Sequence, residues 1–541
     1  MTLATIRPAL TVVLALTALL LSAVVPASAQ TPSVLADLNA GPDDALPSEF
    51  LQIDDNGTPV LIFAATGDNA SGLSVGRELW KTDGTTAGTE LIRDIRGGSS
   101  SSSPGDLVVM NNVVYFVCNT GAAGRELCSS DGTFGGTGLL KDINPGSNDS
   151  QVRGLTVVGN QLFFFADNGT TGLELWVSDG TEVGTQLVQD IYPGSTPLNR
   201  ASSGFNISLT GRFAGTNDTF YFMANDGTTG LELWKSDGTA GGTTLVRDII
   251  SGAQGPQYLQ QFVGVGDLLV FESEETSFDR EIFVSDGTAS GTVQVDVNNS
   301  ADGSSPQDIT RVGDEVYFYA SDASFTSGLY RFDPVNDTNP QLIQNGLRPG
   351  FVNNAIAAYN GGVVFSNRTQ AGAYEIWFSD GGTAWKIADA RARFGSVQAS
   401  GTGFEGDATP EVVGTTLYFQ AETAADGYEL WRTDGTTAGT EVVRNFGAGT
   451  ADGDLTDLAT LNGDQLLFGA IDATSGNELW RIEEPPAVFV ANPVPDQTVF
   501  TGRTDVVDLA EVFETPPGAS LTYTASSADE TIATVQVADA L

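Results

Sequence analysis

Short apolar runs alternate with turn residues along most of this chain. In a representative stretch, apolar runs at residues 155–158 and 161–165 flank the turn residues Gly159-Asn160. Two such runs on either side of a Gly-Asn turn are typical of a β-hairpin. The repeated stretches lack the 3.6-residue period of an amphipathic helix. The pattern therefore predicts an all-β fold.

A motif follows each predicted hairpin. In the third copy Glu174-Leu175-Trp176 leads to Asp179-Gly180-Thr181, then to Gly184-Thr185 and a short strand that ends at Asp190-Ile191. Each unit thus has four short strands, which is typical of a β-propeller blade of roughly 40–50 residues. The nine recognisable copies begin at Glu78, Glu126, Glu174, Glu232, Glu281, Gly328, Glu375, Glu429 and Glu478.

The repeat also predicts how the units pack. Propeller blades stack face to face, so both faces of each sheet are buried, and Leu175 and Trp176 on opposite faces of one strand are both apolar. Nine copies predict a β-propeller of about nine four-stranded blades. Eight blades, or an open or split ring, are the alternatives, because most propellers have about four to eight blades.

The two ends of the repeat region complement each other. The last copy ends after Ile482 without a fourth strand, whereas residues 34–42 match the fourth-strand pattern of residues 139–146. We therefore expect the N-terminal strand to complete the last blade and close the ring, which hides an edge strand.

A small residue stands ten positions before the motif aromatic in several copies, as Ala166 does before Trp176. We expect the hairpin to place these two residues directly opposite each other. In the second copy Cys118 and Cys128 occupy the two positions. Directly opposed residues on antiparallel strands lie close enough for a disulfide, so a structural bridge is predicted; two free thiols are the alternative.

The pattern Glu-Leu-Trp-x-x-Asp-Gly-Thr-x-x-Gly-Thr resembles the bacterial ELWxxDGT repeat proteins. The similarity extends from about Val34 to Ile482 and includes six near-verbatim copies. It implies an exported or surface protein with no assigned activity, and it brings no catalytic residues. The sixth copy has Phe332-Asp333-Pro334 in place of Asp-Gly-Thr and the seventh has an extra glycine at Gly381-Gly382, so irregular blades are expected there.

The chain divides into three expected segments. Residues 1–29 read as a signal peptide, with Arg7 before an apolar run and Ala27-Ser28-Ala29 as the cleavage site. The propeller follows at 30–485. Residues 486–541 resemble the cadherin-like or Ig-like β-sandwiches of bacterial surface proteins, and at about half the usual length this domain is expected to be incomplete. The expected location is secreted or cell-surface, with no membrane insertion after cleavage.

Charge restricts the possible partners. The formal net charge is −44, from 68 acidic and 24 basic residues. Such a surface repels phosphates, which argues against a nucleic-acid partner. Scarce lysine with abundant acid favours adaptation to high salt, where screening reduces self-repulsion. Plain solubility and a reserve of weak divalent-cation sites are the other interpretations.

The absence of histidine removes several chemistries. The sequence contains no His. Ser-His-Asp and Cys-His catalysis are therefore excluded, as are His-ligated zinc, copper and iron sites.

The aspartates of the Asp-Gly-Thr turns are candidate calcium ligands. One carboxylate per turn falls short of the closely spaced set in an EF-hand loop, and Asp and Gly are common turn residues. A structural turn is therefore favoured and no metal or cofactor is predicted, with calcium as a weak alternative. These residues are Asp83, Asp131, Asp179, Asp237, Asp286 and Asp434.

The other recurring carboxylates are also interpreted as structural, because an active site needs a unique constellation. No catalytic residue is nominated. Insertions at Ser203–Asp218 and Ala399–Asp407 lengthen two repeats and are candidate specificity loops, with neutral loop variation as the alternative. The recurring carboxylates are Glu78, Glu174, Glu232 and Glu429 in the motif, and Asp94, Asp142, Asp190 and Asp248 at strand ends.

Together these observations favour a non-enzymatic binding, adhesion or scaffold module whose partner is an unknown surface glycan or protein. The alternative is a carboxylate-based carbohydrate hydrolase or lyase in the central pocket, since that chemistry needs no histidine. A unique buried acidic pair at the propeller axis would favour the enzyme.

Overall fold

A computed structural model describes residues 12–14, 31–40, 43–199, 208–253, 255–276, 279–297, 303–347, 356–369, 371–394, 409–423, 425–447, 449–472, 476–483, 489–490, 497–499 and 513–514. Residues Thr31–Ile482 form one compact unit. The predicted signal peptide and C-terminal sandwich lie outside the described residues, apart from four short strands. These are β1 (Val12–Leu14), which pairs with β40 (Gln497–Val499), and β39 (Phe489–Val490), which pairs with β41 (Phe513–Glu514).

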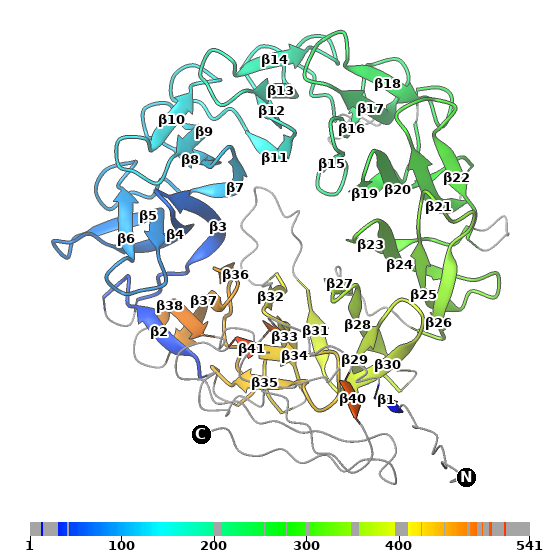
Figure 1. Ribbon diagram of the computed structural model, residues 1–541. Helices are drawn as coiled ribbons and strands as arrows, with labels where there is room; N and C mark the ends of the chain where they lie inside the picture. Colours follow the sequence, from blue (N-terminus) through cyan, green and yellow to red (C-terminus); the bar gives the residue numbers. More distant parts are fainter. Residues whose placement is uncertain are drawn as a thin grey trace, which may run out of the picture. The chain divides into compact units, whose positions relative to one another are not determined.

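Nine antiparallel sheets make up the compact unit (Figure 1). We number them as blades in chain order. Blades 1 to 3 are β3 (Ser48–Asp55), β4 (Thr58–Asp68), β5 (Ser74–Thr82), β6 (Glu90–Arg93); β7 (Gly105–Met110), β8 (Val113–Asn119), β9 (Arg125–Ser130), β10 (Gly138–Lys141); and β11 (Arg153–Val158), β12 (Gln161–Asp167), β13 (Leu173–Ser178), β14 (Gln186–Gln189). Blades 4 to 6 are β15 (Phe213–Gly215), β16 (Phe220–Asn225), β17 (Leu231–Ser236), β18 (Thr244–Arg247); β19 (Gln260–Val265), β20 (Leu268–Glu274), β21 (Arg280–Ser285), β22 (Val293–Val295); and β23 (Gln307–Val312), β24 (Glu315–Ser321), β25 (Ser327–Phe332), β26 (Gln341–Asn345).

Of the last three blades, blades 8 and 9 depart from the order of four consecutive strands. Blade 7 is regular, the innermost strand of blade 8 is in two pieces that both pair with β33, and blade 9 takes its outermost strand from the N-terminus. Blades 7 to 9 are β27 (Ile356–Tyr359), β28 (Gly362–Arg368), β29 (Tyr374–Ser379), β30 (Ala384–Ala388); β31 (Arg391–Arg393) with β32 (Glu411–Val413), β33 (Thr416–Glu422), β34 (Glu429–Thr433), β35 (Glu441–Arg444); and β36 (Leu458–Leu461), β37 (Gln465–Asp472), β38 (Gly476–Glu483), β2 (Ser33–Ala36).

The blades form a closed ring. Contacts between first strands run from β3 through β7, β11, β15, β19 and β23 to β27. Blade 7 then contacts blade 8 through β28 and β29 against β31, and β32 contacts β36, which contacts β3. Figure 1 shows the first strands lining the centre of the ring. The predicted nine-bladed, all-β propeller is therefore confirmed. Blades 6 and 7, expected to be irregular, keep four strands. Blade 6 has Gly328 in place of the motif glutamate, and Glu375 of blade 7 accepts from the side chains of Asn367 and Trp377.

The N-terminal strand closes the ring as predicted. Val34 on β2 pairs with Trp480 on β38. The backbone N–H of Leu38, just beyond β2, donates to the Glu478 carboxylate at 2.7 Å. In blade 3 the N–H of Ile191 makes the equivalent bond to Glu174 at 2.9 Å. The N-terminal segment therefore makes the same contact with the motif glutamate that the segment after the fourth strand makes in the other blades.

Apolar side chains fill the spaces between blades. Leu175 and Trp176 are both buried, as expected for a sheet covered on both faces. Phe163 of blade 3 stacks on Phe220 of blade 4 with ring centroids 5.0 Å apart. Burial of such rings provides most of the driving force for stacking the blades.

The predicted opposition of the small residue and the motif aromatic is wrong. Ala166 pairs with Glu174, and Trp176 pairs with Phe164. The small residue is a diagonal neighbour on the same face, two positions along the strand. In blade 9 the Trp480 indole N–H reaches across this diagonal to the carbonyl of Ala470 at 3.0 Å. The small side chain leaves room for the ring.

The same correction applies to the cysteines. Cys118 pairs with Glu126, and Cys128 pairs with Phe116. Their Cα atoms are 5.9 Å apart and a disulfide joins them. This separation is within the range that disulfides span. The predicted bridge is therefore present, but it joins diagonal rather than opposed residues.

Candidate functional site

The recurring motif glutamate is a buried acceptor for a neighbouring turn. It is fully buried in seven blades. Its carboxylate accepts the backbone N–H of a residue just after the fourth strand, as Glu78 does from Ile95 at 3.0 Å and Glu429 from Phe446 at 2.7 Å. The contact recurs with Glu126, Glu174, Glu232, Glu281 and Glu478. These glutamates hold the blades' outer turns.

Burial raises the pKa of these carboxyls. Desolvation is the main cause in each case, and the neighbouring strand-end aspartate adds to it. The pKa reaches about 9 for Glu174, about 8 for Glu232 and Glu478, and about 7 for Glu126 and Glu281. The carboxyls with the highest values are therefore protonated at neutral pH.

The strand-end aspartates cap the turn that follows them. Asp94 accepts the backbone N–H groups of Gly97 at 2.7 Å and Gly98 at 2.8 Å. Asp142 and Asp190 accept the equivalent glycine N–H groups at 3.3 Å. These contacts are local and repeat from blade to blade.

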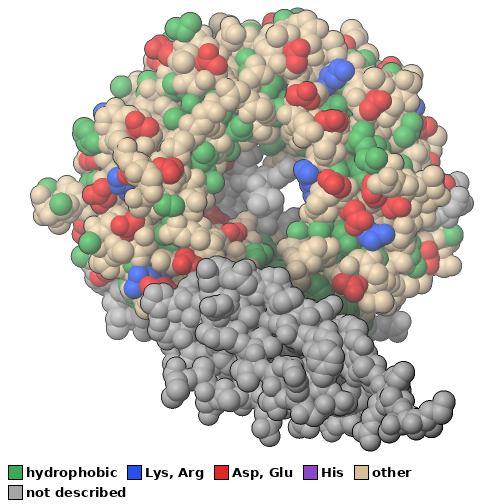
Figure 2. All heavy atoms as spheres, viewed as in Figure 1, with side chains coloured by type: hydrophobic (Ala, Val, Ile, Leu, Met, Phe, Trp, Pro, Cys, Tyr) green, Lys and Arg blue, Asp and Glu red, His purple; other side chains and the backbone are tan. Residues whose placement is uncertain are grey.

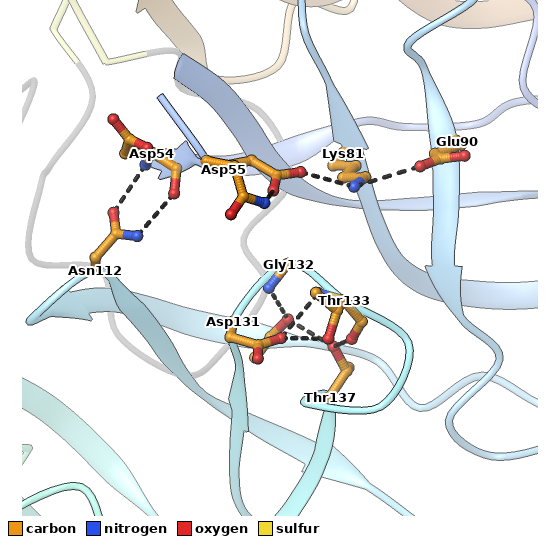
Figure 3. A network of polar contacts seen from close by, with 11 residues as sticks. Asp54, Asp55, Lys81, Glu90, Asn112, Asp131, Gly132, Thr133 and Thr137 are labelled. Carbon is orange, nitrogen blue, oxygen red and sulfur yellow. Dashed lines mark hydrogen bonds and ion pairs between the residues drawn. The ribbon is translucent and has the colours of Figure 1, made fainter. Parts of the chain in front are cut away.

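Each Asp-Gly-Thr turn is closed by its own side chains (Figure 3). The Asp131 carboxylate accepts the backbone N–H and the hydroxyl of Thr133, at 2.9 and 2.7 Å. The Thr137 hydroxyl donates to the Thr133 carbonyl at 2.7 Å. The same threonine donation lowers the pKa of the exposed Asp179, Asp237 and Asp286. Each turn has one carboxylate, and that carboxylate is engaged by its own loop.

The glycine of this turn is the contact point between blades. Gly287 has a φ of +81°, and a Cβ there would lie 2.5 Å from the Tyr221 hydroxyl of the preceding blade. At Gly381 it would lie 2.6 Å from the Tyr317 hydroxyl. The turn glycine of blade 1, Gly84, packs in the same way on Gln465 of blade 9. In the blades that have this glycine, the motif therefore also positions the neighbouring blade.

Part of the first predicted specificity loop and the whole of the second lie outside the described residues. The structure does not describe 203–207 of the first loop or any of Ala399–Asp407. The described remainder of the first loop includes Phe213, which is buried against Phe165 of blade 3. The second loop follows β31 and precedes β32, so both of its ends belong to the innermost strand of blade 8.

Several innermost strands share a β-bulge whose side chain differs from blade to blade. Five innermost strands contain a β-bulge at the same place, and in four of them the bulged residue has a positive φ without being glycine. Bulges re-aim side chains, and positive φ is uncommon for such residues. The four residues, which we call the bulge ring, are Glu49, Asp106, Gln261 and Asp308. Figure 2 shows an opening at the centre of the ring that these strands surround.

One acidic pair adjoins the bulge ring. The backbone N–H of Glu49 donates to the Asp457 carboxylate at 2.9 Å, and the Glu49 carboxylate accepts the N–H of Leu107 at 3.2 Å. Burial raises the pKa of both carboxyls, Asp457 raises that of Glu49 further, and Arg77 opposes both shifts. Sequence reasoning missed this pair; aligning the first strands of all blades would have marked Glu49 as a departure.

A groove of about 400 Å³ lies on the rim between blades 1 and 2. Arg93 lines it and stacks on the ring of the exposed Phe134, 5.1 Å from the centroid. The other lining residues are Ile95, Thr120, Ser129, Gly135, Gly136, Thr137, Gly138 and Leu139. Arg93 also donates to the carbonyl of Thr137, so its guanidinium holds the two blades together.

The described residues contain no group of three or more acidic, Cys or His side chains placed to hold a metal ion. They also contain no helix that is long and apolar enough to cross a membrane.

Comparison with known proteins yields only a likeness of fold. No protein-family model and no curated protein matches the chain. Among solved structures, puromycin hydrolase matches with 14% identity and a TM-score of 0.32, over 69% of this chain and 53% of its own. The β-propeller domain of the Trilobed protease from Pyrococcus furiosus matches with 13% identity and a TM-score of 0.32, over 64% of this chain and all of its own. The chain thus spans about half the length of puromycin hydrolase.

Proposed function

We propose that this chain is an exported, non-enzymatic binding module of the ELWxxDGT repeat type, with a surface glycan or protein as its ligand. The observation that carries the proposal is the structural use of the motif. Its glutamates and aspartates make the same contacts in blade after blade, so they position turns and not reactants. Binding specificity then resides in side chains that differ between blades.

The surface and the disulfide support export. Acidic side chains are spread over the visible face of the ring (Figure 2). The disulfide of blade 2 is of a kind that persists in oxidising compartments. The signal-peptide features of residues 1–29 agree with both.

A secretion and binding experiment tests the proposal. The full chain with its signal peptide is expressed in a bacterial host, recovered from outside the cytoplasm and applied to a glycan array. In parallel it is incubated with chromogenic glycosides. We expect a protein that begins at Gln30, binds a subset of glycans and releases no chromophore. Recovery only from the cytoplasm, or absence of binding to glycans and to host surface proteins, contradicts the proposal.

The acidic pair favours a second candidate, a carbohydrate hydrolase or lyase at the ring centre. Two half-buried carboxyls with raised pKa values, one on the innermost strand of blade 1 and one just before that of blade 9, are the type of pair that such catalysis uses. Turnover of a glycoside that is lost in both Glu49→Gln and Asp457→Asn would establish this activity. Turnover that persists in both variants would exclude this pair.

A further inference from the structure

Blade 2 is the one copy of the repeat without an aromatic residue at the third motif position. Cys128 occupies that position in blade 2. In blade 3 the motif ring of Trp176 packs in one apolar cluster with residues of the preceding blade, and Cys128 likewise faces blade 1. The cysteine therefore removes a ring from the interface between blades 1 and 2. The residues of the other blades at this position are Trp80, Trp176, Trp234, Phe283, Tyr330, Trp377, Trp431 and Trp480.

The same kinds of neighbour surround the ring in the filled blades. In blade 1 the ring of Trp80 lies against Gly67, where a Cβ would be 2.5 Å from the indole. In blade 9 the ring of Trp480 lies 5.1 Å from that of Phe446, and the Arg444 guanidinium lies 4.5 Å from the Trp480 centroid. Phe446 and Arg444 both come from the end of the preceding blade. We call the space that these neighbours enclose the tryptophan socket.

The groove between blades 1 and 2 has the walls of this socket. Thr120 is four residues beyond the strand partner of Cys128, as Gly67 is four beyond the partner of its own motif ring. Ile95 donates its backbone N–H to the motif glutamate of blade 1, as the phenylalanine beside the blade 9 ring does in blade 8. Arg93 ends the fourth strand of blade 1, as the arginine beside that ring ends β35. Since Thr120, Ile95 and Arg93 all line the groove of about 400 Å³, the groove is the tryptophan socket of blade 2.

This socket is open to solvent. Ile143 and Ile191, which correspond to Ile95 in the next two blades, are both 4% exposed, whereas Ile95 is only half-buried. The disulfide between Cys118 and Cys128 is fully buried and is not part of the groove lining. It therefore leaves the outer part of the socket unfilled. The volume is within the range of about 300–1,000 Å³ that is usual for ligand pockets.

An exposed aromatic residue stands beside the open socket. Phe134 follows the Asp-Gly-Thr turn of blade 2 and is 68% exposed. The Arg93 guanidinium lies 5.1 Å from its ring centroid, so Arg93 connects the groove to this ring. Blade 2 thus differs from the repeat at two places that meet in one groove. The residues that correspond to Phe134 in the other five Asp-Gly-Thr turns are Thr86, Glu182, Ala240, Ala289 and Thr437.

We infer that the open tryptophan socket of blade 2 binds a tryptophan side chain of a protein partner. This inference rests on the proposed binding function, in its protein-binding form, and names the group that is recognised. The occupant follows from blades 1 and 9, where the same walls hold an indole. Arg93 is held in place by the carbonyl of Thr137 and offers a cation–π contact to an incoming ring. The ring would also cover the apolar surface of Ile95 and of Leu139, which is 42% exposed.

Saturation-transfer NMR with short peptides tests the inference on the mature full chain. A peptide with one tryptophan between glycines is compared with the same peptide containing leucine, and with methyl glucoside. We expect transfer of saturation to the indole protons and little to the leucine methyl groups. Equal transfer to both peptides overturns the aromatic preference. Methyl glucoside that gives stronger transfer and displaces the tryptophan peptide overturns the protein side chain as occupant.

Refilling the socket locates the site. In Cys118→Ala/Cys128→Trp the chain supplies its own indole, so binding of the tryptophan peptide should weaken by about tenfold or more, as expected for loss of a central contact. Thermal melts and near-UV circular dichroism verify that this variant is folded. Undiminished binding to the refilled variant overturns the assignment.

A matched pair of arginine variants separates binding from blade stacking. Arg247 donates to the carbonyl of Thr292 in blade 5 as Arg93 does to Thr137 in blade 2, but the socket of blade 5 is filled by Phe283. Arg93→Gln should weaken peptide binding severalfold, and Arg247→Gln should leave it unchanged. Equal weakening by both substitutions would show that loss of a blade contact, and not loss of the site, is responsible.

Capture of host surface proteins by the full chain distinguishes this inference from the proposed function. Capture that is lost in the refilled variant supports the socket as the partner site. Capture that persists in this variant overturns the socket as that site and leaves the proposed function intact. The absence of all glycan and surface-protein binding by the wild type removes the proposed function itself.

Discussion

At the scale of single residues, the two glycines of the Asp-Gly-Thr-x-x-Gly-Thr motif meet different requirements. The first has a positive φ and packs against the preceding blade, as Gly287 does. The second lies against the carboxylate of its own turn. At Gly242 a Cβ would overlap the Asp237 carboxylate, whereas the adjacent Gly241 has open space around it. The repeat agrees with this difference, because Gly242 is the motif glycine before Thr243 and Gly241 occupies a variable position.

The adjacent glycines of blade 4 provide a matched test. We expect Gly242→Ala to lower the free energy of unfolding by about 1–3 kcal/mol, because the methyl group displaces the carboxylate that closes the turn. Gly241→Ala should change it by less than about 0.5 kcal/mol. Urea denaturation measures both variants. Equal effects of the two substitutions would disprove this account of the motif.

The buried motif glutamates predict a dependence of stability on pH. The pKa of Glu174 rises from 4.5 to about 9 on folding, so the folded protein holds a proton that the unfolded chain releases between these values. Its stabilising contribution is complete below pH 4.5 and is lost as the pH rises toward 9. The upper limit is about 1.4 kcal/mol per pH unit for one group.

Thermal melts across that pH range check the glutamate prediction. The melting temperature of the wild type should fall as the pH rises, and Glu174→Gln should show a shallower fall because glutamine does not titrate. Identical slopes for the two proteins would mean that Glu174 is not the titrating group.

At the scale of the elements, blade 2 replaces a packing pair by a covalent one. Most of the other blades place a small residue diagonal to an aromatic ring, as Ala166 is to Trp176, and blade 2 places Cys118 diagonal to Cys128. The hairpins were predictable because apolar runs and Gly-Asn turns fix them locally. The register between the two strands was not predictable in the same way, because it depends on where the chain enters the second strand. The expected pairing was wrong by two positions.

Reduction of the disulfide should therefore destabilise the wild-type protein. It should not affect a variant in which a small residue and an aromatic residue replace the two cysteines. We expect dithiothreitol to lower the free energy of unfolding of the wild type by about 2–4 kcal/mol, the usual contribution of a disulfide. The double variant Cys118→Ala/Cys128→Trp, which restores the pair of the other blades, should be insensitive to the reductant. Denaturation with and without dithiothreitol compares them. A reductant effect of equal size in both proteins would show that the disulfide is not its target.

At the scale of the whole molecule, the ring was readable from the repeat and the candidate sites were not. Nine motif copies are visible in the sequence, and the repeat shows that the last copy lacks its fourth strand, although the contact that completes it is long-range. The Glu49–Asp457 pair joins residues of blades 1 and 9. Their proximity depends on the ring geometry, which spacing along the chain does not encode.

The net charge of −44 predicts that salt stabilises the ring. Molar KCl screens repulsion between surface carboxylates, so the melting temperature should rise by several degrees above its low-salt value. Millimolar CaCl2 should add nothing beyond NaCl of matched ionic strength, because the turn aspartates are held by their own threonines. A large calcium-specific rise would identify these turns as metal sites.

The N-terminal strand of blade 9 has a consequence for biosynthesis. The hydrogen bond from Leu38 to Glu478 joins residues 440 positions apart, whereas its counterpart in blade 3 spans 17. Eight blades can assemble from adjacent segments as the ribosome releases them. The ninth blade cannot form until both of its parts are translated, because its outer strand β2 is translated first and its partner β38 last. Until then the nascent chain exposes two unpaired sheet edges, which invite intermolecular pairing. Closing so long a loop is also a slow, non-local step. A delay of folding until translation and export are complete would protect both edges.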